Sequence, residues 1–212
     1  MPYPAPQNNL PNIWQTPDPP PFLPLPQLEQ LEASWREYVN AGAGRWRMYR
    51  TRYLLVFLLL RHTGARVSEV LALNDLPISR SGDIDYHKGE IYIQTLKRRN
   101  PFKRIVPVKH SILSEISLFQ AEWPEMAGKA FKISRQDFWK VFQKICRKAG
   151  ISKDLAHPHI LRHSRAVELL ANQVPLNAVQ RILGHRNLAS TAVYTQINDE
   201  VAAMILREKG LA

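Results

Sequence analysis

The chain has 212 residues, of which 45% are apolar, and this is enough to build one sizeable hydrophobic core. Its 29 Lys and Arg residues exceed its 18 Asp and Glu residues, and the resulting formal net charge of +11 at pH 7 favours a polyanionic partner, either nucleic acid or an acidic membrane surface. The single cysteine, Cys146, excludes an internal disulfide and a cysteine-based zinc finger, and no apolar run reaches the roughly 18 residues that a membrane-spanning helix needs.

The N-terminal segment, residues 1–26, contains ten prolines. Proline fixes φ and removes a backbone donor, so we expect an extended, polyproline-like tail without a core. A solvated leader is the favoured interpretation, and a docking segment for a partner is the alternative. Residues 27–212 are expected to form a single domain.

The periodicity of apolar residues predicts the elements of this domain. Helical spacing is found at 27–41, 46–62 and about 66–73. The period then changes to two, because residues 84–95 alternate around Lys88-Gly89 and residues 103–108 form a third short run. Further helices are predicted at 109–120, 134–149, 159–172, 175–183, 188–194 and 199–208. The predicted fold is mainly α with a small antiparallel β-sheet.

The positive charge is concentrated after the tail. Residues 1–44 hold one Arg and four acids, so the remaining chain carries +14, and the stretches 45–66 and 91–114 each contain six basic residues and no acid. Some of these charges are expected to be ordinary solvated surface. With no signal-peptide layout at the N-terminus, we expect a cytoplasmic, nucleoid-associated protein.

A cluster of cationic and imidazole groups stands at the predicted start of a helix, in HPHILRHSR at 157–165. His159 and Arg162 are three residues apart and share a helical face, where such donors favour an anion such as a phosphate. His163 lies four residues after His159 and is equally compatible with an inward position. A metal site formed by His157, His159 and His163 is a further alternative, but the neighbourhood offers no cysteine and no close carboxylate.

A second motif, ILGHRNLASTAVY, contributes His185 and, nine residues later, Tyr194. A tyrosine is more often a core or surface residue than a nucleophile. Its phenol has a pKa of about 10, so nucleophilic use requires a base or nearby cations. The basic and imidazole groups of this sequence offer both.

Three stretches together resemble the signature motifs of the tyrosine recombinase (phage integrase) family, in the family's order: TGARVSEVLAL at 63–73, HILRHSRAVELL at 159–170 and LGHRNLASTAVY at 183–194. The basic strand region between the first two resembles the family's β-hairpin. The resemblance covers about residues 45–208. It implies cleavage of a DNA strand by a phenolic nucleophile through a 3′-phosphotyrosyl link, followed by religation, with no metal or nucleotide cofactor.

The resemblance also implies roles for individual residues. Arg66 and Arg162 would bind the non-bridging oxygens of the scissile phosphate, and Lys97 would protonate the departing 5′-oxygen. His159 would take the phenol proton or hold the phosphate, while His185 would donate to a phosphate oxygen and Tyr194 would attack. Arg98, Arg99 and Lys103 are rivals of Lys97 for the role of proton donor, or simple phosphate contacts. Glu69, one helical turn after Arg66, could orient its guanidinium. The residues expected to contact DNA in general are Arg98, Arg99, Lys103, Arg104, Arg135, Lys140 and Lys144.

The chain departs from the family pattern at its N-terminal side. A helical core-binding domain usually precedes the first arginine and forms half of a clamp around the duplex, whereas here 65 residues precede Arg66 and 26 of them are the Pro-rich tail. We therefore expect that a partner protein supplies the other half, that the chain binds one face of DNA weakly, or that it no longer recombines DNA. Separately, the resemblance implies a homo-oligomer such as a tetramer on DNA. A recombinase-derived regulator that only binds DNA is the alternative function, and a DNA-relaxing topoisomerase would use the same chemistry.

Overall fold

The computed structural model describes residues 20–95, 103–185 and 191. Within these ranges the chain forms seven α-helices and one three-stranded antiparallel sheet, so the predicted fold class is confirmed. The elements are α1 (Leu25–Asn40), α2 (Gly44–Thr63), α3 (Val67–Leu71), β1 (Ile84–Asp85), β2 (Glu90–Gln94), β3 (Lys103–Pro107), α4 (His110–Glu122), α5 (Arg135–Lys148), α6 (His159–Ala171) and α7 (Leu176–Leu183).

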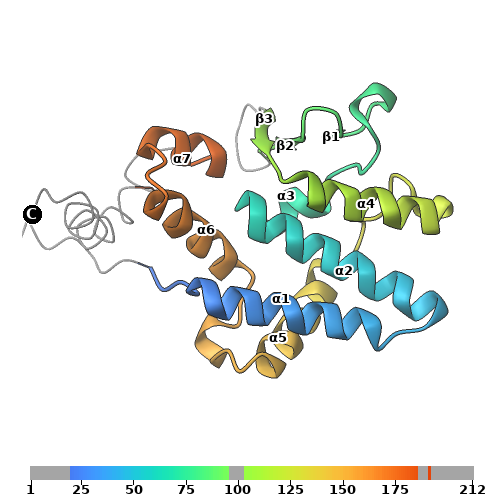
Figure 1. Ribbon diagram of the computed structural model, residues 1–212, viewed down its shortest axis with the longest axis horizontal. Coiled ribbons are helices and arrows are strands. Elements are labelled where there is room, and N and C mark those ends of the chain that lie inside the picture. The colour runs from blue at the N-terminus through green and yellow to red at the C-terminus, as the bar shows by residue number, and fades with distance from the viewer. Residues whose placement is uncertain (1–19, 96–102, 186–190, 192–212) are drawn as a thin grey trace, which may run out of the picture.

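Helix α2 is the central element of the fold. Its apolar run Leu54–Leu60 is buried along its whole length, as expected for a helix that is hydrophobic on all sides. Helices α1, α4 and α6 pack around it, and Figure 1 shows α2 crossing the middle of the molecule between α1 and α4. Gly64, in the left-handed conformation with φ +63°, ends the helix two residues before Arg66.

An aromatic cluster joins α1, α2 and α5. The ring of Trp35 is fully buried and stacks on Phe57 with centroids 5.3 Å apart, and Phe138 and Phe142 pack on the same indole. The N-terminus of α5 is capped by Ser134, whose hydroxyl accepts a hydrogen bond from the backbone N–H of Asp137. This packing fixes the start of α5 beside the start of α3.

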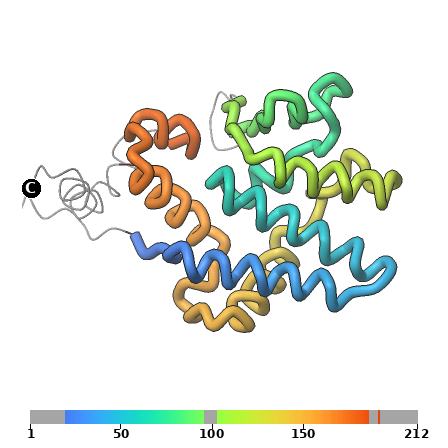
Figure 2. Tube along the Cα trace, in the orientation of Figure 1, coloured from blue at the N-terminus to red at the C-terminus, as the bar shows by residue number. Residues whose placement is uncertain are grey.

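The sheet has the order β1-β2-β3, and all pairs are antiparallel. Alternate residues point into the core, so that Ile91, Ile93 and Val106 are buried. Arg104 lies on the same inward face as Val106 and is paired in register with Ile93. Strand β3 packs against α7, and Figure 2 shows the sheet and α7 side by side.

The N-terminal boundary of the domain differs from the expectation. The Pro-rich tail was expected to extend through residue 26, yet Leu23 is 1% exposed and its backbone N–H donates to the Ser164 hydroxyl at 2.8 Å. Helix α1 begins at Leu25, with Pro24 as its N-cap and Pro26 in its first turn. Proline is tolerated there because the first N–H groups of a helix need no intrahelical acceptor.

The C-terminal part of the described chain forms a smaller second core between α6 and α7. It is built from Ala166, Val167, Leu169, Leu170, Val179 and Leu183. Apart from Thr191, the helices predicted at 188–194 and 199–208 lie outside the described residues. None of the described helices combines the length and the apolar character that crossing a membrane requires.

Candidate active site

Arg66 stands at the N-cap of α3, where Glu69 holds it on two sides. Glu69 Oε2 accepts from the backbone N–H of Arg66 at 2.9 Å, and Glu69 Oε1 accepts from Arg66 Nη1 at 3.0 Å. Glu69 is itself 2% exposed, whereas a quarter of the Arg66 side chain is exposed. Burial raises the pKa of Glu69, but the bonds from Arg104 and Arg66 outweigh burial and leave that pKa below its ordinary value.

Arg162 lies on α6 and connects the backbone of the other two motifs. Its Nη1 donates to the carbonyl of Gly64 at 2.8 Å and to the carbonyl of Leu183 at 2.7 Å. Gly64 precedes Arg66 by two residues, and Leu183 precedes His185 by two. The buried guanidinium therefore brings the three motifs, which are far apart in sequence, to one place.

Two histidines follow each other on the same face of α6. The rings of His159 and His163 meet edge to face with centroids 4.6 Å apart. His159 is exposed, and His163 is half-buried. Burial, together with the neighbouring His159, lowers the pKa of His163 to about 4, so this ring is neutral at pH 7. Of the two positions, His159 is the one that an external phosphate can reach.

His185 follows the left-handed Gly184 that ends α7. Its Nδ1 lies 2.7 Å from the hydroxyl oxygen of Thr191. Burial, together with the positive charges of Arg162 and Arg66, lowers the pKa of His185 to about 3. The influence of both arginines places His185 in their field, and a neutral imidazole there acts through a single N–H donor.

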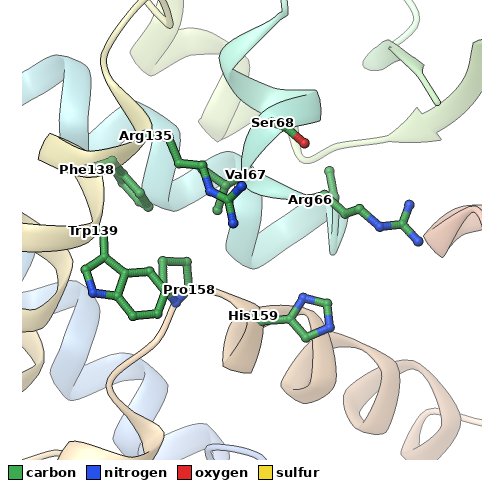
Figure 3. A pocket seen from close by; sticks show the side chains of 9 residues that line it. Arg66, Val67, Ser68, Arg135, Phe138, Trp139, Pro158 and His159 are labelled. Atoms are coloured by element: carbon green, nitrogen blue, oxygen red, sulfur yellow. The ribbon is translucent and has the colours of Figure 1, made fainter. Parts of the chain in front are cut away.

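A cavity of about 160 Å³ opens beside Arg66 and His159. Figure 3 shows these two side chains toward one end of the cavity and Phe138 and Trp139 toward the other, with Arg135 between them in this view. Ser68 and Trp139 were not singled out from the sequence. For Trp139 the signal was its spacing, because it lies four residues after Arg135 and therefore shares that face of α5.

The expected DNA-contacting residues fall into distinct groups. Arg135, Lys140 and Lys144 are exposed on α5, and Lys103 is exposed on β3, where its ammonium group lies 2.9 Å from Asp83. Arg104 does not match the expectation, because it is 5% exposed and its guanidinium bonds to groups inside the fold. Lys97, Arg98, Arg99 and Tyr194 lie outside the described residues.

Two further basic residues of the 45–66 stretch are internal. Arg52 donates to the backbone carbonyls of Lys129, Ala130 and Lys132, and Arg61 forms an ion pair with Glu168 at 2.6 Å. These arginines hold the fold together. The basic surface of the chain is therefore smaller than the sequence alone indicates.

Comparison with known proteins places these features in context. The model of the phage integrase family matches residues 41–201. A tyrosine recombinase XerD from Staphylococcus epidermidis is 33% identical over 164 residues, which cover 71% of this chain and 51% of the relative. A tyrosine recombinase XerA from Thermococcus onnurineus is 31% identical over 160 residues, which cover 71% of this chain and 53% of the relative. The chain thus spans about half the length of these curated relatives.

Solved structures share the fold. The crystal structure of XerA recombinase superposes with a TM-score of 0.68 and 24% identity over 90% of this chain and 63% of that one. The structure of XerH bound to its difH substrate superposes with a TM-score of 0.67 and 24% identity, over 88% of this chain and 53% of that one. The catalytic domain of bacteriophage HP1 integrase superposes with a TM-score of 0.57 and 21% identity, over 90% of this chain and 98% of that domain. From the extent of the family match and the arrangement of its motifs, the chain belongs to the phage integrase family.

Proposed function

We propose that this chain is the catalytic unit of a tyrosine-type site-specific recombinase, which cuts and rejoins double-stranded DNA through a 3′-phosphotyrosyl intermediate. The observation that carries the proposal is the pair of bonds from Arg162 to the carbonyls of Gly64 and Leu183. These bonds gather Arg66, His159, Arg162 and His185 from separate segments around one position. Two guanidinium groups and two imidazoles in that arrangement suit one phosphodiester group.

In the proposed reaction, the phenolic oxygen of Tyr194 attacks the scissile phosphorus and the phenol proton passes to His159. The bond from phosphorus to the 5′-oxygen breaks, and that oxygen takes a proton from Lys97 and leaves as a hydroxyl. Attack by a 5′-hydroxyl of the same or another strand reverses the steps and releases Tyr194. Tyr194 and Lys97 are assigned from the motif alone.

The arginines stabilise the charge that develops on phosphorus. In the transition state the two non-bridging oxygens carry additional negative charge, and donors fixed in place before the reaction stabilise it most strongly. Arg66 is held by Glu69 and Arg162 by two backbone carbonyls, so neither guanidinium has to reorganise. The neutral ring of His185 donates one hydrogen bond to a non-bridging oxygen.

The proposal extends to the partners and the compartment. One structural neighbour is a lambda integrase dimer bound to a core site, with a TM-score of 0.51. We infer that this chain also assembles on DNA, either as a homo-oligomer such as a tetramer or with a partner protein that adds further DNA contacts. The exposed cations of α5 and β3 then contact the phosphate backbone, and the protein works where the chromosome lies, in the cytoplasm.

The test is covalent trapping on a library of end-labelled duplexes that carry a randomised central segment and a nick. After cleavage near the nick, the short released fragment diffuses away, so the strand cannot be rejoined and the protein stays attached. The unsubstituted chain is expected to give a labelled adduct that survives a denaturing gel. Tyr194→Phe is expected to abolish the adduct, and the matched control Tyr92→Phe, on β2, is expected to retain it. Sequence-selective binding with no adduct from the unsubstituted chain would instead favour the DNA-binding regulator.

A further inference from the structure

Arg104 is a buried arginine whose three side-chain nitrogens each reach a different part of the fold. Nη2 donates to Glu69 Oε2 at 2.8 Å, Nε donates to the carbonyl of Ile182 at 2.9 Å, and Nη1 donates to the Thr95 hydroxyl at 3.4 Å. The side chain is 4% exposed. Each of its three nitrogens is engaged by a group inside the fold, and the family motifs in this sequence assign it no role.

The bond to Glu69 makes Arg104 the internal counter-charge of the carboxylate that holds Arg66. A carboxylate buried to this degree requires a buried cation and several hydrogen bonds. Arg104 supplies that cation from the inner side, so the other oxygen of Glu69 is directed at Nη1 of Arg66. A guanidinium that is fixed at one nitrogen keeps its remaining donors in a defined plane.

The bond to Ile182 connects Arg104 to the second half of the site. The last carbonyls of a helix have no intrahelical partner, and cations satisfy them well. In α7, Arg104 donates to the Ile182 carbonyl and Arg162 donates to the next one, at Leu183. Gly184 follows with φ +71°, and a Cβ built there would lie 3.0 Å from Arg104 Nη1. The turn that carries His185 is thus shaped around Arg104.

We propose that Arg104 is a positioning residue of the active site, which aligns Arg66 through Glu69 and sets the place of His185 through the end of α7. The proposal rests on the DNA-cleaving function proposed above. Arg104 contacts neither the phosphate nor the nucleophile in this role. Its loss is expected to lower the rate of strand cleavage while DNA affinity stays the same.

The test compares the rate of adduct formation by Arg104→Lys with that of the unsubstituted chain. The substrate is a duplex whose sequence is recovered from the adducts of the trapping experiment. Lysine keeps the charge but cannot bond Glu69, Thr95 and the Ile182 carbonyl together. We expect adduct formation to slow by about 10²-fold, the effect of a misplaced reacting group, with DNA affinity changed by less than about threefold. Arg61→Lys, which alters a buried ion pair with Glu168 outside the site, is the matched control and is expected to leave the rate unchanged.

A second substrate identifies the route through Arg66. A methylphosphonate at the scissile position replaces one charged non-bridging oxygen with a methyl group, so the reaction depends less on an aligned guanidinium. On the methylphosphonate substrate, Arg104→Lys is expected to be less than about tenfold slower than the unsubstituted chain. The loss of alignment matters less there because less negative charge has to be stabilised. An equal deficit on both substrates would overturn the assignment, as would a parallel loss of affinity and salt dependence, which marks a direct DNA contact.

The double variant Glu69→Gln/Arg104→Met covers the case in which Arg104→Lys does not fold, because it leaves no unpaired buried charge. It is expected to show the same slow cleavage and the same partial recovery on methylphosphonate. Full activity of a folded double variant would overturn the positioning role of Arg104 but leave the proposed DNA-cleaving function standing. Absence of any adduct from the unsubstituted chain would overturn the proposed function, and the role of Arg104 with it.

Discussion

Arg66 and Arg162 differ in how the fold holds them, although both are assigned to the same phosphate. Arg162 is 2% exposed and bonded to backbone carbonyls, so its position is part of the fold itself. Arg66 is more exposed and depends on one carboxylate for its direction. Replacement of Arg66 therefore tests the chemistry with little effect on folding, whereas replacement of Arg162 alters both.

Arg66→Lys is expected to slow adduct formation by about 10²- to 10³-fold, the usual effect of removing one charge-stabilising donor. Lysine retains the charge but cannot bond Glu69 and two phosphate oxygens at once. The rate is measured on the trapped duplex, with affinity measured separately and expected to change by only a few fold. Arg80→Lys, at the surface, serves as the control. A rate within threefold of the unsubstituted chain would contradict the role of Arg66.

The residues of the site differ in how readily the sequence reveals them. Arg66, His159, Arg162 and His185 were identified because their spacing matches a family pattern. The role of Arg104 was missed, although the alternation in Lys103–Pro107 puts Arg104 on the same face as the buried Val106. Its partners include the carbonyl of Ile182, and no residue pattern predicts which backbone group a buried guanidinium will reach.

At the scale of elements, the strongest sequence signals gave the most accurate bounds. The helix predicted at 134–149 is α5 at Arg135–Lys148, because its apolar residues follow one face and Ser134 caps it. The third helix was predicted through residue 73 and ends at Leu71. The proline-rich segment misled the prediction near residue 26, because burial of Leu23 against α6 is a tertiary contact that local composition does not encode.

The end of α7 offers a test of the close contact between Gly184 and Arg104. Gly184→Ala is expected to lower the free energy of unfolding by about 2 kcal/mol, from the left-handed backbone and from displacement of Arg104. Gly150→Ala is the matched control, since Gly150 has φ +70° but no atom within 4 Å of the built Cβ, and it should cost only about 1 kcal/mol. Denaturant titration of both variants measures the difference, and equal losses would contradict a close approach of Arg104.

The whole molecule is predicted to lose stability in mild acid. Burial, together with neighbouring arginine and histidine side chains, lowers the pKa values of His62 and His163 to about 4 and of His185 to about 3, from an ordinary value of 6.5. Between these values and 6.5 the unfolded chain binds more protons than the folded chain, so stability is greatest above pH 6.5 and falls as the pH falls. Burial raises the pKa of Glu168, but Arg61 and Arg165 outweigh burial and lower that pKa to about 2. Glu168 therefore adds a further loss of stability as the pH falls below its ordinary pKa of 4.5.

Unfolding by urea at pH 7.5, 6.0 and 5.0 checks this expectation. The free energy of unfolding should decline over the series, and His62→Gln should show a shallower decline than the unsubstituted chain because one buried imidazole is removed. A free energy that stays constant or rises from pH 7.5 to 5.0 would show that these imidazoles accept protons in the folded state.

Over the whole chain, the central claim is that Tyr194 becomes joined to the 3′-phosphate of a cleaved strand. Mass spectrometry of the trapped adduct, after nuclease and trypsin digestion, tests it most directly. The account predicts a nucleotide on the peptide of residues 187–207, attached through the phenol of Tyr194 and carrying the 3′ polarity of the strand. A nucleotide on any other residue, or one attached through a 5′-phosphate, would contradict it.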